Sequence, residues 1–186
     1  MAAQSSLKNM VLCLTGVCLV CGAILGVIYA VTYEPIKEAA QKALVASIAQ
    51  VLPEGGEISD ALQGGGFEYY ESKAGEDIVG YAVKSSTIGF GGTLSLMVGI
   101  LPDGTVYNTS VLAHSETPGL GAKCTSDPKF VGQWQGFAPD KVLKVKKDGG
   151  DVDAITASTI TSRAYALAVS NAVEFVKSIS GGQENE

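Results

Sequence analysis

The chain has 186 residues, which is enough for one ordinary domain and a short additional segment. It contains 19 acidic and 13 basic residues, so its formal net charge at pH 7 is -6. This acidic balance argues against a nucleic-acid-binding protein, because such proteins present basic surfaces that neutralise phosphates.

The first strong pattern is an apolar segment at residues 11–31, which contains no charged residue, proline, asparagine or glutamine. As a helix it would be about 31 Å long, enough to cross the hydrocarbon core of a membrane. A cleaved signal peptide is the alternative, but the segment exceeds the usual apolar core of such a peptide and lacks a small-x-small cleavage site. The sequence therefore predicts a retained transmembrane helix.

The charges around this segment favour one orientation. Lys8 precedes it, whereas the acidic and basic residues that follow it are balanced. The positive-inside rule then places residues 1–10 in the cytoplasm and the rest of the chain outside it. Three of the four cysteines lie in the span and are interpreted as small apolar residues; they are Cys13, Cys18 and Cys21.

A stalk and a flexible join are predicted between the anchor and the folded domain, over residues 32–66. Apolar side chains recur at helical spacing after Pro35, which suits a first turn, and Pro53 closes the helix. This stalk helix is expected to continue from the anchor. Glycine-rich stretches then follow up to residue 66, as is typical of a turn-rich join.

Residues 67–186 are predicted to form an α+β domain with an antiparallel sheet, because strand-like runs are followed by a closing helix. The turn Pro102-Asp103-Gly104 pairs two of these strands, since proline sets the corner and glycine accepts positive φ. A helix is predicted from Ser162 onward, where small or apolar residues share one face. The predicted strands cover residues 67–72, 77–86, 93–101 and 105–114, with a further short strand at 141–147.

The stretch HSETPGLG, residues 114–121, begins a long segment without periodicity. Long loops of this kind are usually functional in compact domains. Its glycines let the backbone approach a flat ligand, while Glu116 and Thr117 supply polar groups and Leu120 an apolar contact. An ordinary turn with incidental polar residues explains this stretch equally well.

Other site classes find little support in the sequence. His114 is the only histidine, so neither a metal site nor a catalytic residue is predicted. A Ser-His-Asp hydrolase would need a nucleophile elbow of the G-x-S-x-G kind, which the chain lacks. The glycines at residues 89–92 are interpreted as a tight turn rather than a phosphate loop, because no helix follows them.

Hydroxyl residues crowd the start of the last predicted helix. One or two of them would be ordinary N-caps. The unpaired N–H groups and the dipole of a helix N-terminus also favour an anion, above all a phosphate. Five hydroxyls in seven residues exceed what capping requires, so a phosphate site is also predicted; they are Thr156, Ser158, Thr159, Thr161 and Ser162.

The two motifs together resemble those of the FMN-binding domain family. Residues 156–159, TAST, take the place of the family's Ser/Thr-Gly-Ala-Thr core, and HSETPGLG matches its second hallmark. Ala157 stands where the family has glycine, and would be strained if that position had positive φ. Over its whole length the chain resembles the G subunits of Rnf electron-transport complexes, and the related C subunits of sodium-pumping NADH:quinone reductases share the motifs.

The resemblance implies a function and a cofactor. Thr159 would carry covalent FMN through a phosphoester made by a flavin transferase. The chain would relay electrons, with other subunits of the complex, between ferredoxin and NAD while Na+ or H+ crosses the membrane. The rival hypotheses are a tethered binding or assembly module without a redox role, a C-type subunit of a sodium-pumping NADH:quinone reductase, and a stand-alone extracellular flavin domain. Further cofactor-binding residues implied by the resemblance are Thr156, Ser158, Thr161, Glu116, Thr117, Leu120 and Gly121.

Overall fold

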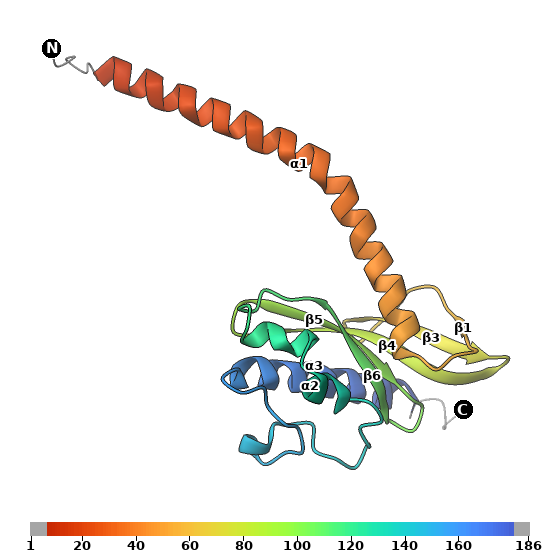
Figure 1. Cartoon of the computed structure of the whole chain (residues 1–186). Coiled ribbons are helices and arrows are strands. Elements are labelled where there is room, and N and C mark those ends of the chain that lie inside the picture. Colours follow the sequence, from red (N-terminus) through yellow and green to blue (C-terminus); the bar gives the residue numbers. More distant parts are fainter. Residues whose placement is uncertain (1–6, 181–186) are drawn as a thin grey trace. The chain divides into compact units, whose positions relative to one another are not determined.

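The computed structural model describes residues 7–180 (Figure 1). Most of the predicted cytoplasmic segment, residues 1–6, and the end of the predicted domain, residues 181–186, lie outside the described residues. The chain divides into two compact units, Met1–Lys42 and Ala43–Glu186.

Helix α1 runs from Leu7 to Val51 and contains both the predicted anchor and the predicted stalk. It is long and apolar enough to cross a membrane, and its most apolar part is not buried by the protein. The stalk continues from the anchor as part of this one helix, but Pro35 lies inside the helix rather than in the first turn expected for it. A proline inside a helix removes one backbone hydrogen bond and crowds the carbonyl four residues earlier, so it weakens this helix locally without ending it.

The second unit contains a six-stranded antiparallel sheet with the order β1-β3-β4-β5-β6, in which β2 also pairs with β3. The predicted turn is confirmed, because the Gly104 N–H donates to the Leu101 carbonyl at 2.9 Å and Gly104 has a φ of 87°. Part of the predicted flexible join is ordered as the two short strands β1 and β2. The strands are β1 Glu57–Ile58, β2 Leu62–Gly64, β3 Phe67–Ala74, β4 Asp77–Ile88, β5 Thr93–Ile100 and β6 Val106–Ala113.

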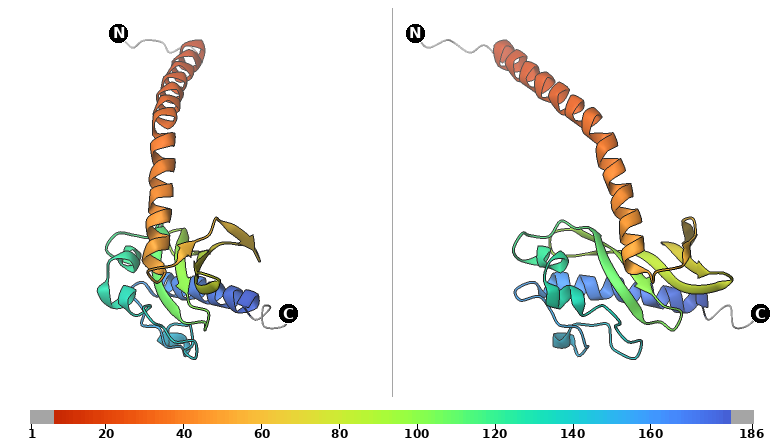
Figure 2. Two further views of the ribbon diagram at one scale, coloured as in Figure 1. Left: turned by 90° about the vertical axis from the view of Figure 1, so that its right-hand side faces the viewer. Right: turned by 45° about the vertical axis from the view of Figure 1, so that its right-hand side comes forward.

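Helix α3, Thr159–Ser180, covers one face of this sheet (Figure 2). Its predicted small-residue face is buried, since Ala164, Ala168 and Ala172 are at most 5% exposed. Small side chains let the helix lie close to the strands, and the Thr87 hydroxyl of β4 donates to the Ala164 carbonyl at 2.9 Å. The helix position is therefore set by packing and by a hydrogen bond to β4.

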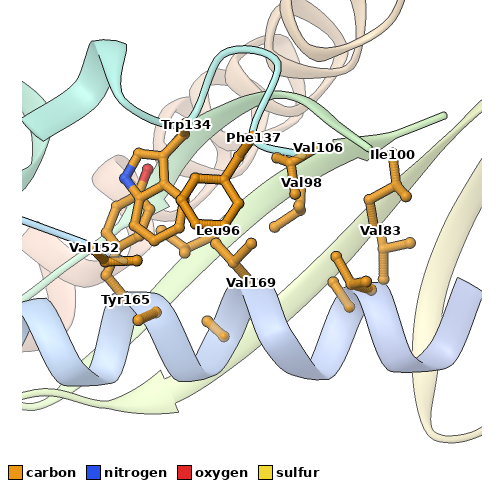
Figure 3. Close-up of a cluster of buried hydrophobic side chains, with 14 of the residues drawn as sticks. Val83, Leu96, Val98, Ile100, Val106, Trp134, Phe137, Val152, Tyr165 and Val169 are labelled. Carbon is orange, nitrogen blue, oxygen red and sulfur yellow. The ribbon is translucent and has the colours of Figure 1, made fainter. Parts of the chain in front are cut away.

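The main core lies between α3 and the sheet (Figure 3). Trp134 comes from the loop after β6, is fully buried, and stacks on Tyr165 of α3 with ring centroids 5.0 Å apart. Phe137 packs beside Trp134 at a centroid distance of 5.7 Å. The long loop is thereby attached to the helix through aromatic side chains.

The opposite face of the sheet packs against the end of α1. Met97 and Gly99 of β5 alternate with residues that face α3, so the strand is covered on both sides. A Cβ at Gly99 would collide with the Val51 carbonyl oxygen, so glycine is needed for this close approach. The apolar residues of this second core are Ile48, Val51, Leu52, Tyr70, Ala82 and Met97.

Two loop predictions need correction. The aperiodic segment after residue 114 contains the 3-10 helix η1, Gly121–Thr125, and the short helix α2, Pro128–Gly132. The predicted strand at residues 141–147 was wrong, because this segment ends in the 3-10 helix η2, Lys146–Asp148. Its backbone pairs with Val152 of the following turn, through hydrogen bonds of 2.8 and 3.0 Å, and forms only an isolated bridge. The α+β class with an antiparallel sheet is confirmed.

Candidate functional site

A cavity of about 370 Å³ lies where the loop after β6 meets the start of α3. Ligand pockets typically measure roughly 300–1,000 Å³, so the cavity has a size suited to a small organic ligand. All predicted cofactor-binding residues except the exposed Thr156 line it. The two sequence motifs therefore form one site, lined by Phe90, Glu116, Thr117, Leu120, Gly121, Ala157, Ser158, Thr159, Ile160 and Thr161.

Glu116 connects the two motifs directly. Its Oε2 accepts a hydrogen bond of 2.8 Å from the Thr161 hydroxyl at the start of α3. Its Oε1 accepts a hydrogen bond of 3.3 Å from the Gly91 N–H in the turn between β4 and β5. Only 5% of Glu116 is exposed, and a buried carboxylate needs such partners to offset its lost hydration. Glu116 therefore holds three separate segments around the cavity.

Glycines make room for this carboxylate. A Cβ at Gly121 would collide with Glu116 Oε2 and would lie 2.7 Å from Thr161 Oγ1. A Cβ at Gly89 would collide with Glu116 Oε1. The glycines at residues 89–92 form the predicted tight turn, in which the Gly89 N–H donates to the Gly92 carbonyl at 2.8 Å. This turn also contributes to the site, which the sequence did not predict.

The first residues of α3 line the cavity. The Ser162 N–H donates to the Ser158 carbonyl at 3.0 Å, which is the first hydrogen bond of the helix. The amides of residues 159–161 precede that bond and therefore have no partner within the helix. All three residues line the cavity, which has no basic side chain in its lining. An anion bound here would be stabilised by helix amides and by the helix dipole.

The hydroxyls of the cluster differ in their availability. Thr161 donates to Glu116, and Ser162 donates to the Ser158 carbonyl at 3.0 Å, so both are engaged in the protein's own hydrogen bonds. Ser158 lines the cavity but is only 7% exposed. Thr159 lines the cavity and is half-buried. Among the five hydroxyl residues of this cluster, Thr159 is therefore the one that both lines the cavity and is accessible.

Ala157 has a φ of 62°, which lies in the left-handed region. It is the only non-glycine residue with positive φ among residues 7–180. This conformation costs an L-amino acid roughly 1–2 kcal/mol relative to the right-handed region. The glycine of the family core would adopt it without strain, so the structure places the strain at the position where the sequence departs from the family.

Apolar side chains form the open edge of the cavity. Phe90 is 69% exposed, Ile160 is 51% exposed and Leu120 is 45% exposed. Exposed aromatic and aliphatic groups beside a cavity suit the faces of a planar ring system. The sequence did not identify Phe90 and Ile160 as site residues. Phe90 lies outside both motifs, in a turn that only its glycines marked, and Ile160 is an apolar residue among the hydroxyl residues that drew attention.

The nearby thiol and imidazole have structural surroundings. Cys124 is fully buried, and this burial, reinforced by the charge of Glu116, raises its pKa to about 11. The thiol therefore stays protonated at neutral pH and is a poor nucleophile. His114 Nδ1 accepts a hydrogen bond of 3.2 Å from the Glu116 N–H, which orders the loop. Among residues 7–180 there is no group of three or more side chains suited to hold a metal ion.

Comparison with known proteins gives consistent matches. Residues 89–174 match the FMN-binding domain family. The chain is 32% identical over 182 residues to the G subunit of the proton-translocating ferredoxin:NAD(+) oxidoreductase complex of Clostridium ljungdahlii, a match that covers 97% of each chain. It is 30% identical over 190 residues to the G subunit of an ion-translocating oxidoreductase complex of Methanosarcina acetivorans, covering 97% of this chain and 100% of the relative. The crystal structure of Shewanella oneidensis NqrC is similar with a TM-score of 0.48 and 21% identity, over 63% of this chain and 60% of that one.

The fold, the cavity and the matched domain define a protein with an FMN-binding domain and an apolar N-terminal helix. The apolar helix and the ion-translocating relatives together indicate that it is anchored in a membrane. The chain belongs to the family of G subunits of ion-translocating oxidoreductase complexes.

Proposed function

We propose that this chain is the flavoprotein subunit of an Rnf-type ferredoxin:NAD oxidoreductase that moves ions across the membrane. The observation that carries the proposal is that two motifs far apart in the sequence line one cavity and are joined by the Glu116–Thr161 hydrogen bond. The relatives that match over nearly the whole chain are subunits of such complexes. The other subunits of the complex are the expected partners, and the chain has no activity alone.

The residues of the cavity fit an FMN group. The amides of residues 159–161 would receive the phosphate, because they precede the first hydrogen bond of α3. Phe90, Leu120 and Ile160 would contact the ring system through their exposed apolar surfaces. A bound flavin supplies the capacity to accept and pass on electrons one at a time, while the protein sets its position and electrostatic surroundings.

We further propose that a flavin transferase attaches FMN to Thr159 through a phosphoester. Thr159 is supported by elimination, since Thr161 and Ser162 are hydrogen-bonded elsewhere, Thr156 lies off the cavity and Ser158 is buried. A covalent bond keeps the cofactor on a domain that lies outside the cytoplasm, where lost FMN is not readily replaced.

The direct test of this function is to purify the full chain from a membrane that contains its complex. Flavin absorbance that stays with the chain, together with co-purification of multi-span subunits, is expected. A chain that carries no flavin and purifies with the same subunits would instead be an assembly module.

The proposed topology gives a second prediction. The N-terminus lies in the cytoplasm, α1 crosses the membrane once, and the domain faces outward. A protease added to intact cells without an outer envelope should therefore digest the domain, whose loops are exposed around residues 139–151. Digestion only after the membrane is broken would contradict the orientation, and a mature N-terminus near Val31 would contradict the retained anchor.

The buried carboxylate gives a third prediction. Glu116→Gln keeps the size of the side chain but removes its charge, so the reduced flavin becomes easier to form. The midpoint potential should rise by about 50 mV, roughly 1 kcal/mol per electron, as expected for a charge near the ring. Thr117→Ala should shift the flavin absorbance spectrum, and both variants should keep the flavin attached.

Glu76→Gln is the matched control, because Glu76 is exposed in the turn between β3 and β4. It removes the same charge away from the cavity and should leave the potential and the spectrum unchanged. If the potential and the spectrum were also unchanged in Glu116→Gln and Thr117→Ala, the loop at residues 114–121 would not contact the flavin.

A further inference from the structure

Ser162 is a fully buried polar residue that the proposed function does not use. Its side chain, on the first turn of α3, is 0% exposed. Its Oγ accepts a hydrogen bond of 2.9 Å from the Ile155 N–H and donates one of 3.0 Å to the Ser158 carbonyl. One hydroxyl therefore connects both ends of the segment that precedes the helix.

That segment is a closed turn. The Ser158 N–H donates to the Ile155 carbonyl at 3.0 Å, so residues 155–158 are joined end to end by their backbone. Ile155 is 3% exposed and Ser158 is 7% exposed, so both ends of the turn are buried. Ala157 lies between them with its φ of 62°.

A left-handed alanine persists only where the surrounding structure holds it. In this turn the backbone bond between Ser158 and Ile155 is supported by the two hydrogen bonds of Ser162. Thr159 follows the turn directly and is the first residue of α3. The strained turn that Ser162 supports therefore stands directly before Thr159.

We propose that Ser162 is a positioning residue for flavin attachment: its buried hydroxyl holds the turn at residues 155–158 and thereby presents Thr159 at the cavity. This inference rests on the proposed function of Thr159. In the attachment step an O–P bond forms between Thr159 Oγ1 and the phosphorus of a flavin donor. The hydroxyl loses its proton, and the phosphoanhydride bond of the donor, a flavin dinucleotide, breaks and releases a mononucleotide. No electron is transferred in this step. Its rate depends on how the Thr159 hydroxyl is oriented toward the phosphorus, because reacting groups must be held in the right geometry.

The test uses the full chain in detergent, produced without flavin, and a purified flavin transferase with flavin adenine dinucleotide. Ser162→Ala should attach FMN at least about tenfold more slowly than the parent chain. Hydrogen exchange of the unmodified protein should also become faster at the amides of residues 155–162. Ser178→Ala is the matched control, because the Ser178 hydroxyl donates to the Phe175 carbonyl at 2.6 Å on the same helix but far from the turn.

A rescue variant separates positioning from general stability. Ala157→Gly removes the left-handed strain, so the turn should persist without its support from Ser162. The double variant with Ser162→Ala and Ala157→Gly should regain most of the attachment rate. Should Ser162→Ala fail to fold, Ser162→Cys, which keeps the size and weakens both hydrogen bonds, takes its place with the same expectations.

Each result of the attachment measurements either supports or overturns the role proposed for Ser162. Slow attachment that Ala157→Gly restores supports the inference. A parent-like rate in the Ser162 variant, or a slow rate that Ala157→Gly does not restore, overturns the inference while the proposed function stands. If the parent chain itself takes up no covalent FMN, the proposed attachment to Thr159 fails, and the inference fails with it.

Discussion

Thr159→Ala is expected to abolish covalent flavin attachment while the domain stays folded. Thr159 is the half-buried hydroxyl residue on the cavity, and alanine leaves the transferase without an acceptor. The loss of one partly exposed hydroxyl typically costs about 1 kcal/mol of stability. The measurement is flavin fluorescence of the denatured chain on a gel, which should disappear, alongside circular dichroism, which should not change.

Two further variants make this result specific. Thr159→Ser keeps a hydroxyl and should retain part of the attachment. Ser158→Ala removes the neighbouring hydroxyl, whose residue is 7% exposed, and should leave the fluorescence in place. Fluorescence that survives Thr159→Ala and disappears in Ser158→Ala would move the attachment site by one residue. If Thr159 is only a helix cap, Thr159→Ala would leave the flavin content unchanged.

Trp134→Ala is expected to have the largest effect on stability, about 3–5 kcal/mol, which is typical for deleting a buried tryptophan. Trp134 is fully buried and packs against Phe137 and against Tyr165 of α3 (Figure 3). It also packs edge-on against Phe130 of α2. Its removal would leave a cavity between the loop and α3. Urea unfolding of the full chain in detergent should show the loss as a lower midpoint with an unchanged slope.

Trp134→Phe is the control for this prediction. Trp134 Nε1 is buried, and among residues 7–180 it finds no hydrogen-bond partner. Phenylalanine removes this unpaired donor while it keeps an aromatic ring, so the variant should lose much less stability than Trp134→Ala. Equal losses in the two variants, or a loss below about 1 kcal/mol in Trp134→Ala, would contradict the central place of this ring in the core.

Most of the sheet and the closing helix could be predicted from the sequence, because their patterns are local. Strands β3 to β6 follow from apolar and β-branched runs separated by turn residues, and Gly104 has the positive φ that its turn requires. The buried face of α3 follows from the spacing of its alanines. The two motifs were also identified, yet only the fold shows that Glu116 and Thr161 are hydrogen-bonded.

The features that the sequence did not predict correctly have separate physical causes. Residues 141–147 alternate like a strand, but no sheet strand pairs with them, and their backbone bonds to Val152 instead. Pro35 resembles a helix start, but the surrounding apolar and charged residues are all compatible with one continuous helix. Phe90 could not be identified as a site residue, since its place on the cavity depends on Gly91 binding a carboxylate 25 residues away. Strain at Ala157 was expected only if its φ were positive, and its φ of 62° in the structure meets this condition.

The most direct test of the attachment site is a fragment mass spectrum of the purified chain across residues 153–163. We expect the intact chain to carry the added mass of one FMN less one water, and the fragments to place this mass on Thr159. An unmodified peptide from a chain purified with its complex, or the added mass on Ser158 or Thr156, would contradict the assignment.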